Sequence, residues 1–398
     1  MDYVFRRLYT DEDCTRRFLV ADEVGLGKTL VARGVIAKAI NHLWQTVPRI
    51  DIIYICSNSN IARQNIARLN VLGNKDESRS SRISLLPTVI KDLNNRKVNF
   101  ISLTPGTSFD ISSGTGIGNE RALLYSMLRD EWNLDDGKPL NVFCGGMELK
   151  NFKKLVKEYQ NKKKHSIDPH LKACFLSIVQ DSTDGVIGDS GISLRNRVSE
   201  LSKAFSDPAL TAARKRELKK RSNRCISELR ALLVRSCLKA LEPDLIILDE
   251  FQRFKHLMYG EDGEDESSIS ARELAKELFS YADENSQARV LLLSATPYKM
   301  YTTAAESGME DHYKDFLKTL EFLVQDTGVI EKCESIIREY RSELFRIGDG
   351  DNSHLVHLKE SLESQLRMVM VRTERLAASE DRNGMLMEVH DGSAKLRP

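Results

Sequence analysis

The chain has 398 residues, of which 41% are hydrophobic and 29% charged, with a formal net charge of +1. This composition describes a soluble globular protein of two or three domains, and no run of about 18 apolar residues is present that could span a membrane. The seven cysteines never occur as Cys-x-x-Cys, so neither a zinc site nor a disulfide framework is indicated. The start Met1-Asp2-Tyr3 lacks a secretory leader, and we therefore expect a cytoplasmic protein.

Charge is distributed unevenly along the chain. Residues 150–239 contain 21 Lys and Arg against 9 Asp and Glu, so this part carries an excess of 12 positive charges and the rest sums to −11. Acidic residues are concentrated at 261–266. The most basic run, 214–224, would have positive charge on every face of a helix, which fits a solvated helix and a nucleic-acid contact equally well.

A glycine-rich loop lies between the apolar run 18–20 and the amphipathic run 30–43, which is the strand–loop–helix layout of a phosphate-binding P-loop. Its residues are Asp22, Glu23, Val24, Gly25, Leu26, Gly27, Lys28, Thr29 and Leu30. The glycines allow backbone N–H groups to approach phosphate oxygens at the positive end of the following helix. We expect Lys28 to reach the β- and γ-phosphates of ATP and the Thr29 hydroxyl to hold Mg²⁺. An ordinary strand-to-helix turn is the alternative, since Asp22 stands where the general pattern has glycine.

Two further apolar strands are expected at 51–56 and 98–103. The first ends in the polar cluster 57–60, which can cap a helix carrying Ala62, Ile66 and Leu69 on one face. The second runs into Thr104-Pro105-Gly106-Thr107, which also fits a simple turn. Apolar strands that alternate with helices predict a parallel sheet covered on both faces.

After residue 109 the alternation of apolar strands and helices is no longer regular. Helical segments are expected at about 118–132 and 148–165, and regular apolar spacing resumes at Ile226 in a helix that leads back into the sheet. We interpret roughly 110–225 as a largely helical insertion in a compact domain.

A second decisive element is the apolar strand 245–248, which ends in Asp249 and Glu250. A nucleotide hydrolase needs such a carboxylate pair beside its P-loop: Asp249 to hold Mg²⁺ and Glu250 to orient and deprotonate the attacking water. The alternative is that Glu250 is simply a solvated acid at the end of a strand, without a role in hydrolysis. We expect the Lys28 ammonium and this acid pair to lie at the same edge of one sheet.

A third element is the strand 290–293, which ends in Ser294 and, two residues later, Thr296. Both hydroxyls also fit plain helix caps. Between the second and third elements, Ser270 and Glu273 form a capping box that predicts a helix start. Beyond residue 300 the chain reads as helices at 310–324, 329–345 and 353–368.

The motifs ADEVGLGKT, SNSNIARQN, TPGT, LDEFQRF and SATP, in this order, resemble the first RecA-like lobe of superfamily 2 helicases and translocases. They are similar to the Swi/Snf-type group, in which the P-loop also begins with aspartate. The resemblance implies an α/β fold, a RecA-like P-loop NTPase lobe with a central parallel sheet, and Asp249 and Glu250 as the Walker B pair. It also implies that Ser294 and Thr296 couple hydrolysis to movement, and that Ser57, Thr104 and Gly106 contact nucleic-acid phosphates.

The resemblance assigns 1–109 and 226–300 to the two parts of the lobe, 110–225 to the insertion and 301–398 to a helical region leading to a second lobe. Residues 368–375 are similar to the segment that joins the lobes, but arginine fingers and an adenine-reading glutamine have no candidate. We therefore expect an N-terminal fragment, or a subunit completed by another chain, that hydrolyses ATP weakly on its own.

The leading hypothesis is an ATP- and Mg²⁺-dependent motor acting on nucleic acid, double-stranded DNA in the first place, with a second RecA-like lobe or partner subunit. The alternative is a non-motor nucleotide switch or scaffold whose basic insertion docks a partner. ATPase activity that rises with added nucleic acid would distinguish them.

Overall fold

The computed structural model describes residues 1–22, 27–73, 82–109, 114–135, 137–161, 166–184, 192–260, 266–283, 286–294, 312–345, 352–372, 386–388 and 394–396. Five residues of the predicted sites lie outside these ranges: Glu23, Val24, Gly25, Leu26 and Thr296.

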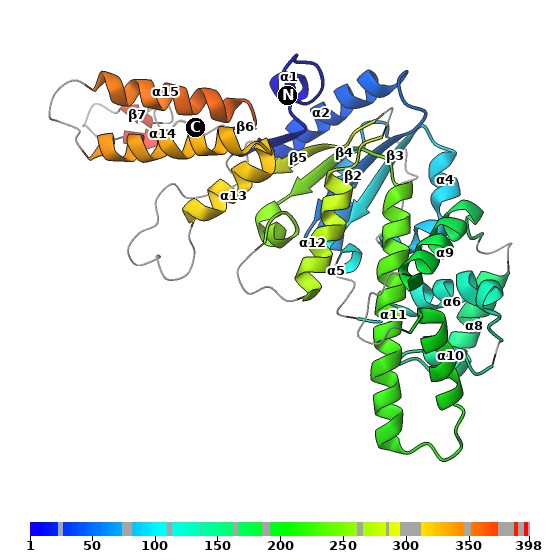
Figure 1. Ribbon diagram of the computed structural model, residues 1–398. Coiled ribbons are helices and arrows are strands. Elements are labelled where there is room, and N and C mark those ends of the chain that lie inside the picture. The colour runs from blue at the N-terminus through cyan, green and yellow to red at the C-terminus, as the bar shows by residue number, and fades with distance from the viewer. Residues whose placement is uncertain are drawn as a thin grey trace.

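Six parallel strands form one sheet in the order β3-β2-β4-β5-β1-β6 (Figure 1). They are β1 (Arg17–Val20), β2 (Ile50–Cys56), β3 (Val98–Leu103), β4 (Pro243–Asp249), β5 (Arg289–Leu293) and β6 (Met370–Val371). The first five form where the apolar runs predicted them, which confirms an α/β fold with a parallel sheet. The sequence had not indicated β6, which pairs with β1 from the segment likened to an inter-lobe connection.

Helices cover both faces of the sheet, so β1, β2 and β5 are buried along their whole length and most residues of β3 and β4 are buried as well. Alternate strand side chains, such as Val20 and Leu293, pack against the helices α1 (Asp2–Tyr9), α2 (Lys28–Leu43) and α3 (Ser59–Leu69). The intervening side chains, such as Leu19 and Leu292, face the other layer, which includes α11 (Ala212–Ala240), α12 (Glu266–Phe279) and α13 (His312–Val324).

Helix starts follow local capping chemistry, with one correction. The Asn58 side chain accepts hydrogen bonds from the N–H groups of Asn60 and Ile61, so the polar cluster after β2 caps α3 as expected. The predicted capping box at Ser270 and Glu273 is wrong, because α12 already begins at Glu266.

The region between β3 and β4 is helical among its described residues. It contains α5 (Pro105–Ser108), α6 (Gly118–Trp132), α7 (Leu140–Phe143), α8 (Leu149–Gln160), α9 (Pro169–Asp184), α10 (Leu194–Ala204) and then α11. Two short elements, η1 (Ile83–Thr88) and α4 (Ile90–Asn94), precede β3. Helix α11 is continuous over 29 residues, so it passes through the predicted boundary at residue 225 and joins the insertion to the sheet (Figure 1).

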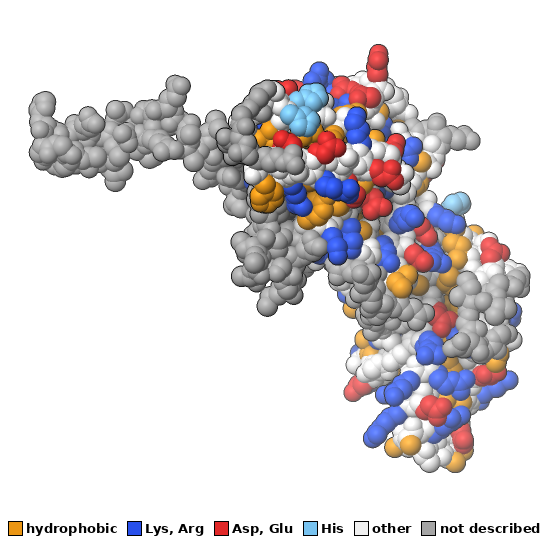
Figure 2. All heavy atoms as spheres, turned by 60° about the vertical axis from the view of Figure 1, so that its left-hand side comes forward, with side chains coloured by type: hydrophobic (Ala, Val, Ile, Leu, Met, Phe, Trp, Pro, Cys, Tyr) orange, Lys and Arg blue, Asp and Glu red, His pale blue; other side chains and the backbone are white. Residues whose placement is uncertain are grey.

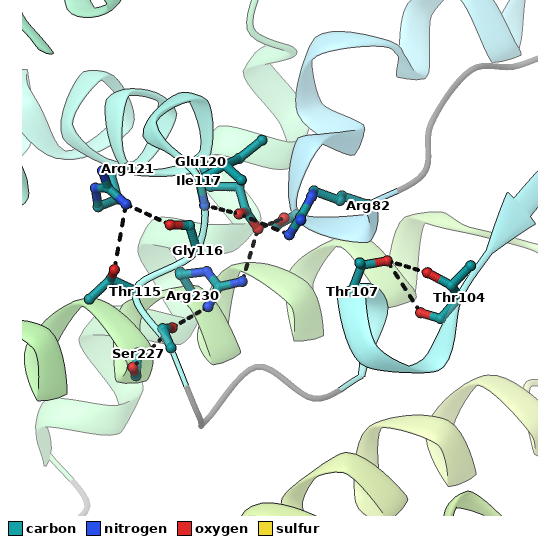
Figure 3. Close-up of polar contacts among 12 residues, drawn as sticks. Arg82, Thr104, Thr107, Thr115, Gly116, Ile117, Glu120, Arg121, Ser227 and Arg230 are labelled. Carbon is teal, nitrogen blue, oxygen red and sulfur yellow. Dashed lines mark hydrogen bonds and ion pairs between the residues drawn. The ribbon is translucent and has the colours of Figure 1, made fainter. Parts of the chain in front are cut away.

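A buried ion network fastens the insertion to the segment before β3. The Glu120 carboxylate on α6 is fully buried and accepts hydrogen bonds from Arg230 on α11 (3.0 Å), Arg82 (3.3 Å) and Ser84 (2.5 Å) (Figure 3). The N–H of Ile117 donates to the same carboxylate at 2.7 Å. Burial alone would raise the pKa of Glu120, but the Arg230 charge and these hydrogen bonds outweigh it and lower the pKa.

The C-terminal part adds η2 (Phe251–Leu257) after β4, the packed helices α14 (Thr327–Leu344) and α15 (Ser353–Arg367), and an antiparallel pair of short strands, β7 (Leu386–Glu388) and β8 (Ala394–Leu396). The N-terminal helix is tied to this part, since Tyr3 donates a hydrogen bond to the carbonyl of Arg367 at 2.6 Å. Within the described residues, the helices are too short or too polar to cross a membrane.

Candidate functional site

The ends of four strands meet in register at one edge of the sheet. Val20 lies opposite Leu293, Leu293 opposite Asp249, and Asp249 opposite Cys56. The polar residues that follow these strands are therefore brought to one edge, although they are up to about 270 positions apart in the chain. This is the carboxyl edge, where ligands bind in open α/β sheets.

Helix α2 presents its positive end at this edge. Gly27 precedes the helix with φ 83° and ψ 31°, a left-handed conformation that glycine adopts without steric cost. Within the described residues, no side chain caps the start of α2. The N-terminus of this 16-residue helix, preceded by glycine, offers N–H groups and a positive dipole end to an anion.

Lys28 begins α2 and interacts with the residue that ends the described part of the loop before it and with Asp249. Its Nζ donates a hydrogen bond to the carbonyl of Asp22 at 2.9 Å, and its charge lowers the pKa of Asp249. The expectation that Lys28 and the acid pair share one sheet edge is confirmed. Thr29 is half-buried and Leu30 is exposed, whereas Asp22 is buried.

Asp249 is held by two residues that the sequence analysis missed. The Tyr54 hydroxyl donates a hydrogen bond to Asp249 Oδ2, and Asn65 Nδ2 donates to the Tyr54 oxygen at 2.8 Å and to Asp249 Oδ2 at 3.4 Å. Side chains alternate along a strand, so Asp249 shares the α2 and α3 side with Leu245 and Ile247. A tyrosine inside a buried apolar strand indicates a polar contact in the tertiary structure, because its hydroxyl needs a hydrogen-bond partner. Tyr54 could have been found by this signal.

The electrostatics of Asp249 favour a cation beside it. Burial raises the pKa of this carboxyl, the hydrogen bond from Tyr54 lowers it, and the neighbouring Glu250 charge raises it again, with a net upward shift. Desolvation thus makes the ionised form costly in the absence of a positive partner. A bound cation would stabilise that form.

Glu250 has an unusual backbone conformation. Its φ of 52° and ψ of 44° lie in the left-handed region, which costs a non-glycine residue about 1–3 kcal/mol. The N–H of Glu250 bonds to the Leu293 carbonyl at 3.1 Å, and its half-exposed carboxylate pairs with Arg253 Nε at 3.0 Å. The tight turn separates the two acids, so that Asp249 is partly buried and Glu250 faces solvent.

Ser294 connects the end of β5 with β1 and with η2. Its N–H donates to the Val20 carbonyl at 3.0 Å, and its buried hydroxyl accepts a hydrogen bond from Gln252 Nε2. Gln252 lies on η2, directly after the acid pair, and was not singled out from the sequence. Ser294 is therefore in contact with the segment that follows Glu250 and with the strand that precedes the glycine loop.

The three predicted nucleic-acid contacts follow β2 and β3 at the same edge. Ser57 Oγ is buried and has no hydrogen-bond partner among the described residues. Thr104 Oγ1 lies 2.5 Å from Thr107 Oγ1 at the start of α5 (Figure 3). Space is open around Gly106, where an added Cβ would meet no described atom within 4 Å.

A competing hollow lies at the opposite, amino edge of the sheet. It has a volume of about 420 Å³, and its lining includes Tyr9, His42, Asp244 and Arg289. The described residues of its lining include neither a lysine nor the start of a helix, so its chemistry is less suited to phosphate. Within the described part of the chain, no group of three or more His, Cys, Asp and Glu could hold a metal ion by itself.

Comparisons of this chain with protein-family models, with curated proteins and with solved structures found no match. The residues of the site combine a helix end and an ammonium group that suit an anion with a partly buried carboxylate that suits a cation.

Proposed function

We propose that the chain is the ATP-binding, RecA-like lobe of a nucleic-acid-dependent ATPase of the helicase or translocase type. The observation that carries the proposal is the position of Lys28, at the start of α2 and close enough to the partly buried Asp249 for its charge to lower that carboxyl's pKa. A metal–triphosphate needs this combination of one cation for phosphate and one carboxylate for metal. The parallel sheet, with the motifs at its strand ends, is compatible with the RecA-like lobe implied by the sequence resemblance.

The residues present fit ATP and Mg²⁺. Thr29 and Asp249 offer a hydroxyl and a carboxylate, which are oxygen ligands of the kind Mg²⁺ prefers, and the net upward pKa shift of Asp249 would be relieved by the ion. When bound, Mg²⁺ would neutralise charge on the phosphate oxygens. The loop from Asp22 to Leu30 would surround the phosphates.

The protein residues then have separate tasks in hydrolysis. Lys28 would exchange its bond with the Asp22 carbonyl for one with a phosphate oxygen. Glu250, exposed beside the partly buried Asp249, would align a water molecule and accept its proton at a carboxylate oxygen. We expect this chain alone to hydrolyse ATP weakly, because a second lobe or a partner subunit would complete the site.

Ser294 is well placed to couple hydrolysis to movement on nucleic acid. Its contacts reach η2 through Gln252 and β1 through Val20, so a shift at Glu250 has a path to the loops at the same edge. Ser57, Thr104 and Gly106 would contact the phosphates of the nucleic acid, for which we propose double-stranded DNA.

The proposal is tested by ATP binding to Lys28→Ala, with Lys38→Ala as the matched control. Both lysines lie on α2, but Lys38 is exposed and pairs with Asp2 at 2.7 Å, ten residues from the site. Loss of a charged hydrogen bond worth about 1.5–3 kcal/mol should weaken ATP binding about 10- to 150-fold in Lys28→Ala. Titration with a fluorescent ATP analogue checks this. Equal affinity in the Lys28→Ala variant and the wild type would refute the nucleotide site.

The rival function, a nucleotide switch that docks a protein partner, keeps the ATP site but does not need nucleic acid. ATPase rates of the protein with its second lobe, measured with and without duplex DNA, separate the two. Stimulation supports the motor, and complete indifference to DNA and RNA supports the switch.

A further inference from the structure

Helix α11 consists of two chemically different halves. Its C-terminal half packs on the sheet through Leu229, Leu233 and Cys237, which are buried with strand residues in one core. Its N-terminal half carries seven exposed cations and one acid, Glu217. The cations are Arg214, Lys215, Arg216, Lys219, Lys220, Arg221 and Arg224.

The basic half projects beyond the carboxyl edge of the sheet. Only residues 241 and 242 separate α11 from β4, so the helix runs back along the strand in the opposite direction. The seven residues of β4 span about 23 Å, which about 15 helical residues match. Residues up to about 225 therefore extend past the edge by about 20 Å, and Figure 1 shows the lower part of α11 beside α10, below the sheet.

The acids near this projection neutralise little of its charge. Arg214 pairs with Glu217 at 2.7 Å and Arg221 with Glu200 at 3.9 Å. Among the residues that the structure describes, no acidic side chain lies within ion-pair distance of the other five cations. Figure 2 shows Lys and Arg side chains gathered over this lower part of the molecule.

The concentration of like charge is unfavourable for the isolated helix. Lys220 lies four residues from both Arg216 and Arg224, a spacing at which like charges repel on a helix surface. A polyanion would remove this repulsion. The phosphates of duplex DNA provide about one charge per 1.7 Å of axis, so about 20 Å of helix can meet several of them.

We propose that residues 212–224 of α11, the basic projection, bind the phosphate backbone of duplex DNA that lies along the carboxyl edge of the sheet. This inference rests on the proposed action on nucleic acid and adds a second contact region outside the strand-end motifs. Ser57, Thr104 and Gly106 would contact the duplex at the sheet. The basic projection would continue the contact beyond it, without reading the base sequence.

The test compares Lys219→Gln/Lys220→Gln/Arg224→Gln with Lys332→Gln/Arg338→Gln/Lys359→Gln in the full chain. Both triple variants remove three exposed helical cations, but the second set lies on α14 and α15, outside the insertion. Binding of a fluorescent DNA duplex of about 20 base pairs is measured over a series of salt concentrations. Each lost phosphate contact should reduce the slope of log affinity against log salt by about 0.9.

We expect the α11 variant to lose about 2 to 3 in slope and at least about tenfold in affinity at low salt, with the control unchanged. An unchanged slope in the α11 variant overturns the inference. Equal affinity of the wild-type protein for poly-glutamate and for DNA also overturns it, because the surface would then suit an acidic protein. Affinity for ATP is measured in the same variants. Loss of DNA binding with intact ATP binding supports the projection, whereas failure of Lys28→Ala to affect ATP would refute the nucleotide site independently.

Discussion

The hydroxyl of Tyr54 donates a hydrogen bond to Oδ2 of Asp249 from β2 to the neighbouring strand β4. Asn65 on α3 donates to both partners and so fixes the phenol in place. The bond stabilises the ionised carboxylate and opposes the effect of burial, which raises the pKa of Asp249. In the proposed site, Tyr54 is a positioning residue that keeps Asp249 charged and correctly oriented for the metal.

Tyr54→Phe should therefore raise the pKa of Asp249 further. Because the metal requires the ionised form, the pH midpoint of Mg²⁺-dependent ATP binding should move upward by about one unit, the equivalent of a hydrogen bond to a charged group. Titration of ATP affinity against pH measures the shift. Tyr3→Phe is the control, since that hydroxyl bonds to the carbonyl of Arg367 away from the site. The same midpoint in the Tyr54→Phe variant and the wild type would exclude this role.

Glu250→Gln should separate binding from hydrolysis. The amide keeps the shape of the side chain but cannot accept the proton from water, so turnover should fall about 10²- to 10⁴-fold while ATP affinity stays within about twofold. Steady-state ATPase assays, with parallel ATP titrations, provide the measurement. Glu277→Gln, an exposed acid on α12, should retain full turnover. Wild-type turnover in Glu250→Gln would rule out Glu250 as the base.

Glu120→Gln should destabilise the insertion strongly. The change removes the negative charge between Arg230 and Arg82. The buried Arg230 then lacks a carboxylate to compensate its charge, and this should lower the unfolding free energy by about 3–5 kcal/mol. Glu217→Gln breaks an exposed pair on α11 and should cost less than about 1 kcal/mol. Urea unfolding of both variants gives the comparison. Similar losses in the two would show that the buried network adds nothing beyond a surface pair.

Asp244 should make stability depend on pH. Burial raises its pKa to about 6, although hydrogen bonds from the Asp51 N–H and the Ser286 hydroxyl lower it. A carboxyl with a raised folded-state pKa binds more protons when folded, so its contribution to stability falls as pH rises from about 4 to about 6.

Asp244→Asn removes this penalty. The amide oxygen can still accept the hydrogen bond from the Asp51 N–H, and the amide nitrogen can donate to the Ser286 hydroxyl in place of the bond that this hydroxyl donates in the wild type. The difference in unfolding free energy between the variant and the wild type should increase by about 2–3 kcal/mol in favour of the variant when the pH is raised from acidic to neutral. Urea unfolding at about pH 4 and about pH 7 measures the difference, and the other titrating groups cancel between the two proteins. A pH-independent difference would contradict the prediction.

Much of the sheet and part of the site could be predicted locally. The apolar runs ending at Val20, Cys56, Leu103 and Asp249 are strands because a buried parallel strand needs apolar residues on both faces. β6 was missed because two residues are too few for a pattern, and its pairing with β1 depends on where the chain returns. Helix α11 crosses the predicted boundary at 225 because its basic half packs on the insertion through Leu218 and Ser222, and its apolar half packs on the sheet.

The sequence by itself determined which residues end each strand and carry polar chemistry, because apolar periodicity and glycine-rich loops are local properties of the chain. Only the tertiary structure decided which strand ends are neighbours. The contact of Tyr54 with Asp249 joins positions 195 residues apart, and no local pattern encodes such a pairing. The left-handed turn at Glu250 was likewise decided by the sheet, since the bond from its N–H to the Leu293 carbonyl exists only once β4 and β5 are side by side.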